Sequence, residues 1–388
     1  MTSNLLSGIK VLIVTSSHEA TDHRIRDKEA LSLAAAGASV TIIGAHSYEG
    51  AADDGITVVS PPKARARLER FLRQPWRCGA LAAPISADII HLHDPELLQI
   101  VPWLRLRHPG ARIIYDVHED FPELVRIRDY LPGFCRALMP RAVDLVEKGL
   151  ARSVDAVIAV TPRLAVRFKN RYREALYNFP SHRFYDRALR SSQPPEARPY
   201  DLVHLGTLSA ARARFLAETL AIVHRERPSF KALVTGAHSH TVEQLKALDI
   251  PGCAIEGVMP YDLVPLRLGS ARIGLDVHPF PTANLRAALP VKVFEYMAAG
   301  CAVVASAMPV LSDLAGRDRH LRGDMSVIAG GEPGDYADSI LRLLERIDRG
   351  EPIGERLRAA ARDSYVWERE AQKMIAFYSR LLSWKSRN

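Results

Sequence analysis

Short apolar runs rich in β-branched residues alternate with helical patterns along almost the whole sequence, and this alternation constrains the fold more than any other feature. In the first half, the pattern predicts strands at 10–15, 39–44, 88–92, 112–117 and 155–160. Continuous apolar runs of this length are typical of parallel strands that helices cover on both faces. A helix is predicted over 26–36, with Gly37 at the position where helices commonly end.

The second half shows the same alternation of strand and helix patterns. It predicts strands at 201–206, 231–236, 253–257, 272–276 and 302–306. It predicts helices at 212–226, 241–248, 261–270, 290–299 and 335–348. Two successive βαβ series favour an α/β chain with two Rossmann-like, doubly wound domains. The length of 388 residues agrees, because it exceeds what one core ordinarily holds.

The boundary between the two domains is predicted near 185–199, because SSQPPEARP in this segment is rich in serine and proline and shows no periodicity. We therefore expect one domain over 1–190 and a second over 191–366. A last helical pattern runs over 367–384. We expect the segment 367–388 to pack back toward the N-terminal domain.

Composition excludes several classes of protein. Hydrophobic residues make up 47% and charged residues 25%, which argues against disorder. No apolar run reaches the ~20 residues that span a bilayer. The early run KVLIVTS fits a first buried strand better than a signal peptide. The four cysteines are far apart and form no C-x-x-C pair, so we expect neither disulfides nor a zinc ribbon, and a cytoplasmic location.

The net charge of +8 predicts anionic partners such as nucleotide diphosphates, lipid phosphates or nucleic acid. Segment 63–77 carries six basic residues and one acid, with apolar residues between them. Taken as one helix, it is a basic amphipathic surface that could lie on an anionic membrane. The alternative is a solvated helix that packs its few apolar residues on the domain. No RNA- or DNA-binding motif is visible, so nucleic acid ranks last among these partners.

The most informative segment is LPVKVFEYMAAGCAVVAS at 289–306. Pro290 stands where a helix can begin, and Gly300 stands where it ends. Lys292 and Glu295 are three residues apart, so they share a face near the helix N-terminus, where free N–H groups attract phosphate. The lysine would add charge on a diphosphate, and the carboxylate could accept hydrogen bonds from two ribose hydroxyls. A solvent-exposed Lys–Glu pair is the alternative.

This segment resembles the nucleotide-binding helix of retaining GT-B glycosyltransferases of family 4, and the resemblance covers nearly the whole chain. The other segments that resemble this family are TSSH…DHRI at 15–25, SLAAAG at 32–37, HLHDPELL at 91–98, YDVHED at 115–120 and LGTLS…R at 205–212. The resemblance implies a GT-B fold, with two Rossmann-like domains facing a central cleft. The N-terminal domain would bind the acceptor, and the C-terminal domain would bind the nucleotide-sugar.

The resemblance also implies roles for individual residues of the C-terminal domain. Glu295 would bind the donor ribose, while Lys292 and Arg212 would hold the diphosphate and stabilise the transition state. Arg214 is the alternative candidate for the diphosphate contact assigned to Arg212. The remaining residues implied in donor binding are Gly206, Val258, Met259 and Val291.

In the N-terminal domain, the resemblance implies that His118 contacts the donor sugar close to the reacting carbon. A capping histidine in a loop is the alternative for this residue. The residues implied at the acceptor are Asp22, Arg24, Asp94, Glu119 and Asp120. For Glu119 and Asp120, ordinary helix N-cap roles weigh equally, because acids favour that position.

Two positions depart from the family pattern. The family has a glutamate eight residues before the one at 295, and this chain has Ala287 there. That glutamate helps to hold the donor sugar in the family. The family also has a Gly-Gly turn after the first strand, where this chain has Ser16-Ser17-His18.

A metal site is a rival interpretation of the polar residues in the first half. The candidate ligands are His91, His93, Asp94, His118, Glu119 and Asp120. Alternation along a strand puts His91 and His93 on one face, but an H-x-H pair alone is a weak signal for zinc. We expect no metal ligands and no cofactor, because the family needs no bound metal.

Together these features predict a hexosyltransferase that moves a sugar from a UDP- or GDP-sugar to a hydroxyl acceptor with retention, in bacterial polysaccharide or glycolipid biosynthesis. The resemblance implies that the departing phosphate oxygen helps to deprotonate the acceptor, so that no protein nucleophile is required. Expected partners are a lipid-linked or soluble saccharide and, through 63–77, the inner face of the plasma membrane. The alternatives are a GT-B sugar-nucleotide epimerase and a catalytically inactive nucleotide-sugar-binding partner.

Overall fold

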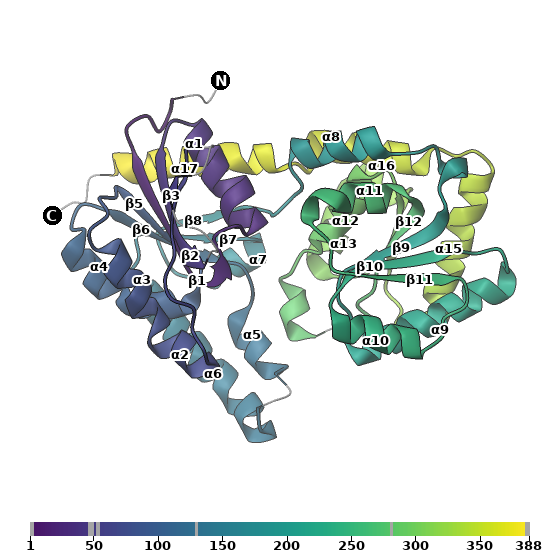
Figure 1. Ribbon diagram of the computed structural model, residues 1–388, viewed down its shortest axis with the longest axis horizontal. Helices are drawn as coiled ribbons and strands as arrows, with labels where there is room; N and C mark the ends of the chain where they lie inside the picture. The colour runs from purple at the N-terminus through teal and green to yellow at the C-terminus, as the bar shows by residue number, and fades with distance from the viewer. Residues whose placement is uncertain (1–3, 46–49, 52–54, 129–130, 280–281, 385–388) are drawn as a thin grey trace. The chain divides into compact units, whose positions relative to one another are not determined.

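The chain divides into two compact units in the computed structural model, which describes residues 4–45, 50–51, 55–128, 131–279 and 282–384. The first unit comprises Met1–Asn178 and Trp367–Asn388, and the second comprises Phe179–Val366. Each unit is a sheet flanked by helices (Figure 1). Among the described helices, none combines the length and apolar character needed to cross a bilayer.

The first unit has an eight-stranded sheet in the order β3-β4-β2-β1-β5-β6-β7-β8. All neighbouring strands pair in parallel except β3, which is antiparallel to β4 at the edge. The strands are β1 (Lys10–Glu19), β2 (Ser39–Ala45), β3 (Gly50–Ala51), β4 (Thr57–Val59), β5 (Ile89–Leu92), β6 (Arg112–Val117), β7 (Ala156–Ala159) and β8 (Tyr172–Ala175). The helices are η1 (His23–Ala30), α1 (Leu31–Ala35), α2 (Arg67–Leu72), α3 (Gln74–Ala82), η2 (Pro95–Ile100), α4 (Val101–Arg107), α5 (Phe121–Arg126), α6 (Gly133–Ala151), α7 (Pro162–Ala165) and α17 (Trp367–Ser383).

The second unit has a six-stranded, fully parallel sheet in the order β11-β10-β9-β12-β13-β14. Its strands are β9 (Tyr200–Leu205), β10 (Ala232–Ala237), β11 (Cys253–Gly257), β12 (Ala271–Asp276), β13 (Ala302–Ser306) and β14 (Met325–Ile328). Its helices are α8 (His182–Ser191), η3 (Pro195–Ala197), α9 (Ala210–Glu226), α10 (Ser239–Ala247), η4 (Tyr261–Leu263), α11 (Val264–Gly269), η5 (Ala283–Arg286), α12 (Val291–Ala298), α13 (Pro309–Arg317), α14 (Arg319–Arg322), α15 (Pro333–Asp348) and α16 (Ile353–Ser364).

Both sheets reverse their strand order at one point, between β1 and β5 in the first unit and between β9 and β12 in the second. This is the doubly wound, Rossmann-like topology that the sequence predicts. In such sheets the chain leaves the two central strands toward opposite sides, which opens a crevice beyond their carboxyl ends where ligands bind. The topology therefore indicates one candidate ligand-binding edge in each unit.

Helix α17, the yellow C-terminal helix of Figure 1, packs on the first unit although its sequence follows the second. Its side chains Met374, Phe377 and Leu381 belong to the same buried cluster as residues of β1 and β2. The Trp367 indole N–H lies 3.1 Å from the carbonyl oxygen of Lys28 and 2.9 Å from the hydroxyl of Ser32. The alternation of apolar residues in 367–384 reflects this buried face.

The predicted strands of both halves are present, with ends that agree within a few residues. The predicted helix 26–36 is instead a π-helix, η1, followed by the short helix α1. Its i→i+5 bonding brings Arg24, Lys28 and Glu29 onto one buried face. The side chain of Asp22 caps this helix by accepting hydrogen bonds from two backbone N–H groups.

The segment 185–199 differs from the predicted linker. Residues up to Ser191 belong to helix α8, which buries Phe184, Tyr185 and Ala188. Ser181 caps its N-terminus by accepting from the backbone N–H of Phe184. The division between the units therefore falls at 178/179, before the predicted boundary at 190.

The basic segment 63–77 is not one helix. It forms α2 and α3, which are separated at Arg73, and residues 63–66 precede the first of them. A proline at 75 explains the break, because proline is tolerated in the first turn of a helix and not in its interior. Leu68, Leu72 and Trp76 remain 69%, 58% and 49% exposed.

Gly274 in β12 allows Tyr296 of α12 to pack directly on the sheet. A Cβ at this glycine would lie 2.2 Å from Cγ of Tyr296. The Tyr296 hydroxyl accepts from the backbone N–H of Leu205 at 2.9 Å and donates to the carbonyl oxygen of Leu275 at 3.1 Å. The tyrosine therefore joins the ends of β9 and β12.

We expect Gly274→Ala to lower the free energy of unfolding of the second unit by about 1–3 kcal/mol or more, because the ring and helix α12 must move to admit the methyl group. Gly316→Ala in α13 is the matched control, since no atom lies within 4 Å of its Cβ position. It should stabilise the helix slightly. Urea unfolding of both variants measures the difference, and equal stabilities would contradict this packing.

Candidate functional site

The candidate donor site lies at the carboxyl edge of the second sheet, where β9 and β12 separate. After β9 the chain turns at Gly206, whose φ of +96° favours glycine. Helix α9 then begins behind Ser209, whose hydroxyl caps it. Helix α12 begins behind Pro290, which provides no side-chain cap for the first N–H groups of the helix. The edge therefore presents helix N-termini, which favour negative charge.

Lys292 of α12 reaches back to the end of β9. Its Nζ donates a 2.8 Å hydrogen bond to the carbonyl oxygen of Leu205 and lies 3.8 Å from the Asp276 carboxylate. A Cβ on Gly206 would stand 3.4 Å from this Nζ. Burial lowers the pKa of Lys292, and the nearby Arg212 lowers it further, although Asp276 opposes the shift. The nearby carboxylates thus compensate only in part for the burial of the ammonium group.

Arg212 of α9 lies at the same edge. Its Nε donates a 2.6 Å hydrogen bond to the carbonyl oxygen of Val277, just after β12. Its Nη2 is buried and has no hydrogen-bond partner in the part of the chain that the structure describes. Burial also lowers the pKa of Arg212. Arg214, the predicted substitute, is exposed on another face of α9, so it does not join this group.

One buried carboxylate faces these two cations. Asp276 is fully buried at the end of β12, and its pKa is lowered by His278, Lys292 and His204 despite burial. His278 holds it with a 3.0 Å contact from Nδ1. Burial lowers the pKa of both cations although Asp276 opposes the shift, so a bound anion would favour their charged forms.

Glu295 lies one turn further along α12 and is 6% exposed. Its Oε1 accepts a 2.7 Å hydrogen bond from the hydroxyl of Tyr261. Val258 and Met259 follow β11 in the loop before Tyr261, and Val258 is 64% exposed. Val291 is the first residue of α12. The structure thus gathers Lys292, Arg212 and Gly206 closely, with Glu295 beside them.

In the first unit, β6 ends at Val117 and His118 follows it at the carboxyl edge of the sheet. The His118 side chain is 18% exposed, and its Nε2 lies 2.9 Å from Nδ1 of His93. Burial lowers the pKa of His118 to about 4, so the imidazole is neutral at physiological pH.

Asp94 has an internal role that differs from the predicted acceptor contact. One of its oxygens accepts hydrogen bonds from the Thr15 hydroxyl at 2.7 Å and from the backbone N–H groups of Ser16 and Ser17. The other lies 3.2 Å from Nδ1 of His18. These bonds and this pair lower the pKa of Asp94 to about 2 although burial opposes them. Asp94 therefore fixes the Ser-Ser-His turn that replaces the family's glycines.

The other predicted acceptor residues also have structural positions. Arg24 is 4% exposed and forms ion pairs inside the unit, so its charge is not presented to an acceptor. Asp22 caps η1, and Asp120 caps α5 by accepting from the backbone N–H of Glu123. For Asp120 this is the N-cap role that the sequence offered as an alternative. Glu119 is exposed beside His118.

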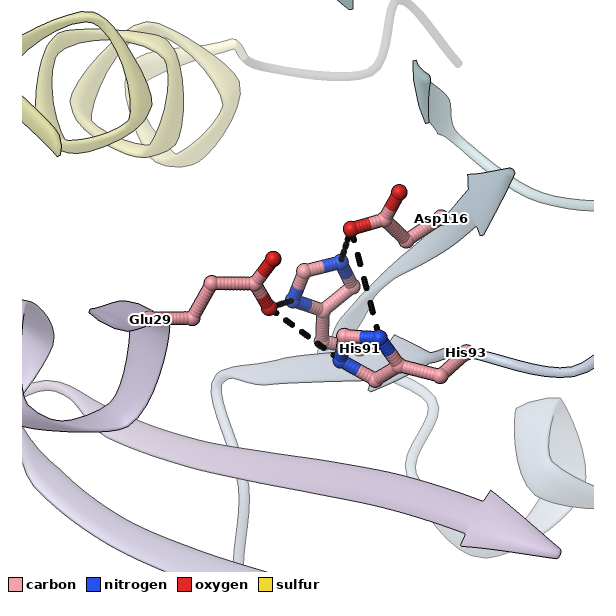
Figure 2. Close-up of side chains that lie close together, drawn as sticks. All are labelled: Glu29, His91, His93 and Asp116. Carbon is pink, nitrogen blue, oxygen red and sulfur yellow. Dashed lines mark ion pairs between the residues drawn. The ribbon is translucent and has the colours of Figure 1, made fainter. Parts of the chain in front are cut away.

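The rival metal set is assembled only in part, with His118 at 2.9 Å from His93. His91 and His93 do share a face, but Asp94 turns to His18 and Glu119 is exposed. Their neighbours are instead Glu29 of η1 and Asp116 of β6 (Figure 2). Glu29 comes from a distant helix and was missed, since only its place on the buried face of η1 reveals it.

Comparison with known proteins agrees with this architecture. Residues 28–176 match the model of the glycosyl transferase 4-like domain, and residues 199–346 match that of glycosyl transferases group 1. No curated protein matches the sequence significantly.

Solved structures of similar fold extend over nearly the whole chain. Sucrose-phosphate synthase from Thermosynechococcus elongatus is 14% identical, with a TM-score of 0.73, over 97% of this chain and 99% of that one. Anabaena HepE in complex with UDP and glucose is 15% identical, with a TM-score of 0.67, over 96% and 99%. A glycosyltransferase from Rickettsia africae is 12% identical, with a TM-score of 0.66, over 97% and 99%. With one glycosyl transferase family model matching each unit, the chain belongs to the GT-B glycosyltransferases of group 1.

Proposed function

We propose that the chain transfers a hexosyl unit from a nucleotide-diphosphate sugar to a hydroxyl acceptor. The observation that carries this proposal is the edge of the second sheet where the buried cations Lys292 and Arg212 converge, with Nη2 of Arg212 lacking a hydrogen-bond partner among the described residues. A diphosphate beside the N-terminus of α12 would accept charge-assisted hydrogen bonds from these two buried cations. HepE has been solved with UDP-glucose, which supports a nucleotide-sugar as the donor class, either a UDP- or a GDP-sugar.

Each residue of the edge has a proposed task. Lys292 and the free Nη2 of Arg212 donate charge-assisted bonds to the diphosphate, and these bonds strengthen as the leaving phosphate gains charge. Glu295 accepts from the ribose hydroxyls. Gly206 and Val291 line the phosphates with backbone groups. The nucleobase meets the main chain at Val258 and Met259, and no metal or other cofactor is needed.

The first unit supplies His118, which we propose contacts the donor sugar, and Glu119, which faces the acceptor. Transfer with retention follows from same-face attack, in which a phosphate oxygen takes the acceptor proton. A related fold, trehalose-6-phosphate synthase, is described as a retaining enzyme. His118→Ala should therefore reduce transfer while nucleotide affinity stays largely unchanged.

Nucleotide affinity should fall with rising pH, and earlier than an ordinary lysine would predict. Only the charged form of Lys292 attracts phosphate, and its pKa in the free protein is lowered from 10.5. Affinity is therefore complete below this lowered pKa and is lost as the pH rises through it. Calorimetric titration with UDP at increasing pH measures the fall. Lys292→Arg, which keeps its charge, should remove this pH dependence; an identical profile would contradict the assignment.

A thermal-shift screen against UDP-, GDP-, dTDP- and ADP-sugars tests the proposed function, because a selective ligand raises apparent stability. Slow release of nucleoside diphosphate from the stabilising donor would identify a transferase. A changed donor sugar without acceptor would identify an epimerase. Stabilisation without either reaction would indicate an inactive binding partner, and no stabilisation by any donor would contradict the proposal.

We also propose that the first unit lies on an anionic membrane surface, on its cytoplasmic side. Leu68, Leu72 and Trp76 project into solvent among basic residues of 63–77. Helix α6 adds a second apolar surface that the sequence analysis missed, formed by Phe134, Leu138, Met139, Leu145 and Val146. A lipid-linked saccharide is the acceptor class that fits such a surface, with a soluble saccharide as the alternative.

Co-sedimentation with vesicles tests this surface. We expect binding to vesicles that contain anionic lipid and little binding to neutral ones, because basic residues near a membrane contribute about 1 kcal/mol each. Arg65→Glu with Arg73→Glu should weaken binding by about 30-fold or more, since both are exposed and each contributes about 1 kcal/mol. Arg319→Glu, which reverses an exposed charge in the second unit, is the control and should leave binding unchanged. Binding that is independent of anionic lipid would contradict the proposal.

A further inference from the structure

Five ionisable side chains meet in the interior of the first unit, beneath His118. They are Arg24, Glu29, His91, His93 and Asp116, and each is at most 4% exposed. Figure 2 shows the two imidazoles lying between the two carboxylates. The proposed transfer reaction uses none of these five groups directly, so their burial requires another explanation.

With neutral imidazoles, the charges in this cluster balance only if one carboxyl group holds a proton. Arg24 lies 2.9 Å from Glu29 and 2.8 Å from Asp116, so one guanidinium faces two carboxyl groups. Burial raises the pKa of Asp116, but Arg24 and the neighbouring histidines lower it further, so the net shift is downward. Burial and Asp116 raise the pKa of Glu29 well above its usual range although Arg24 opposes this shift. Arg24 donates a hydrogen bond to Asp116, whereas neither oxygen of Glu29 has a hydrogen-bond partner among the described residues. We therefore assign the negative charge to Asp116 and the proton to Glu29.

The neighbouring imidazoles do not compete for this proton. Burial lowers the pKa of His91 to about 4 and that of His93 well below its usual value. Asp22 raises the pKa of Glu29 further, and Tyr378 of α17 faces the same group. The Tyr378 hydroxyl contacts Nδ1 of His91 at 2.8 Å.

A chain of polar atoms runs from Glu29 to the surface. Glu29 Oε2 lies 3.3 Å from Nε2 of His93, and neither atom has a hydrogen-bond partner among the described residues. A proton between them satisfies both atoms. On the far side of the ring, Nδ1 of His93 lies 2.9 Å from Nε2 of His118. This leaves Nδ1 of His118 as the ring nitrogen available to a ligand.

We propose that Glu29 is a positioning residue that sets, through His93, which nitrogen of His118 carries its proton. Protonated Glu29 donates to Nε2 of His93, whose Nδ1–H then donates to Nε2 of His118. His118 must consequently carry its own proton on Nδ1, because a neutral imidazole has one donor and one acceptor. If Glu29 were ionised, every bond in this chain would reverse, and His118 would present a lone pair instead.

The consequence for catalysis rests on the proposed function. His118 with Nδ1–H is a hydrogen-bond donor toward an oxygen of the donor sugar, and it neither takes nor gives up a proton. The buried cluster thus makes His118 a hydrogen-bond donor whose proton stays on Nδ1. The tautomer itself is a property of the free protein and can be measured without any nucleotide.

Nitrogen-15 spectra of histidine-labelled full-length protein test the proposal at about pH 7, where an unperturbed imidazole is mostly neutral. The His118 signals are assigned by their loss in His118→Gln. We expect Nδ1 of His118 to be protonated. His93→Leu should move the proton to Nε2, because the nearest remaining acceptor is the ionised Asp116 at 3.8 Å. His91→Leu is the matched control, equally buried, and should leave the His118 tautomer unchanged.

Variants of Glu29 separate positioning from packing. Glu29→Gln retains an N–H donor toward His93 and should keep His118 protonated on Nδ1, whereas Glu29→Leu should give a mixture of tautomers. A wild-type His118 protonated on Nε2, or a pure Nδ1–H form in Glu29→Leu, would overturn the proposal. Stoichiometric zinc uptake by the wild-type protein would overturn it too, because a metal would occupy the ring nitrogens. If no donor binds but the tautomers behave as expected, only the proposed function fails.

Discussion

Replacing Glu295 with alanine is expected to weaken the binding of UDP and GDP by about 100-fold or more, because hydrogen bonds to a charged group contribute about 1.5–3 kcal/mol each and the proposed site has two. The carboxylate is 6% exposed, so water replaces its bonds poorly once it is removed. Calorimetric titration of the wild type and the variant with both nucleotides measures the loss.

Two further variants separate this effect from general damage. Tyr261→Phe removes the 2.7 Å hydrogen bond to Glu295 and leaves the carboxylate in place, so nucleotide binding should be largely retained. Glu218→Ala changes an exposed acid on α9 and should have no effect. Unchanged affinity in folded Glu295→Ala would remove the ribose assignment.

Replacing Arg212 with methionine is expected to lower kcat for transfer by about 100- to 1,000-fold, the size measured for loss of one preorganised donor to a developing negative charge. The Nη2 group of Arg212 is buried without a partner in the described chain, and the Nε bond to Val277 holds it in place. The guanidinium group of Arg212 is thus in position before the diphosphate binds. Single-turnover rates with saturating donor measure this step apart from binding.

Arg214→Met is the matched control, because it makes the same change two residues along the same helix. Arg214 is exposed, so its removal should change kcat less than about twofold, as ordinary surface substitutions do. Equal losses in the two variants would indicate a general effect of charge. A rate unchanged in Arg212→Met would contradict the assigned role.

Periodicity in the sequence predicted the sheets well for a physical reason. Each central strand is covered on both faces, so runs such as 11–14 and 302–305 are continuously apolar. The helices were harder to predict where their apolar residues do not face the core. Helix α6 exposes Phe134, Leu138 and Leu145, so its pattern does not indicate burial.

The candidate donor edge was predictable because its residues lie in one local motif. Proline at 290 and glycine at 300 bound a helix whose N-terminus must meet the carboxyl edge of β12, and Lys292 and Glu295 follow from that register. Their roles toward a donor stay predictions. Arg212 lies at the same edge through the topology of β9 and β12.

The polar residues of the first unit were not predictable in this way. Arg24 and Asp94 have the charge expected of acceptor-binding groups, yet their partners are Asp116 and His18 from distant segments. Glu29 takes part only because the π-helix turns it inward. Such pairings depend on tertiary contacts, which no local spacing in one sequence encodes.

A crystal structure of the protein with bound UDP tests the central claim most directly. The account predicts the pyrophosphate at the N-termini of α9 and α12, within hydrogen-bond distance of Lys292 and Arg212, with the ribose hydroxyls on Glu295. A nucleotide bound elsewhere, with these three side chains free of contact, would contradict it.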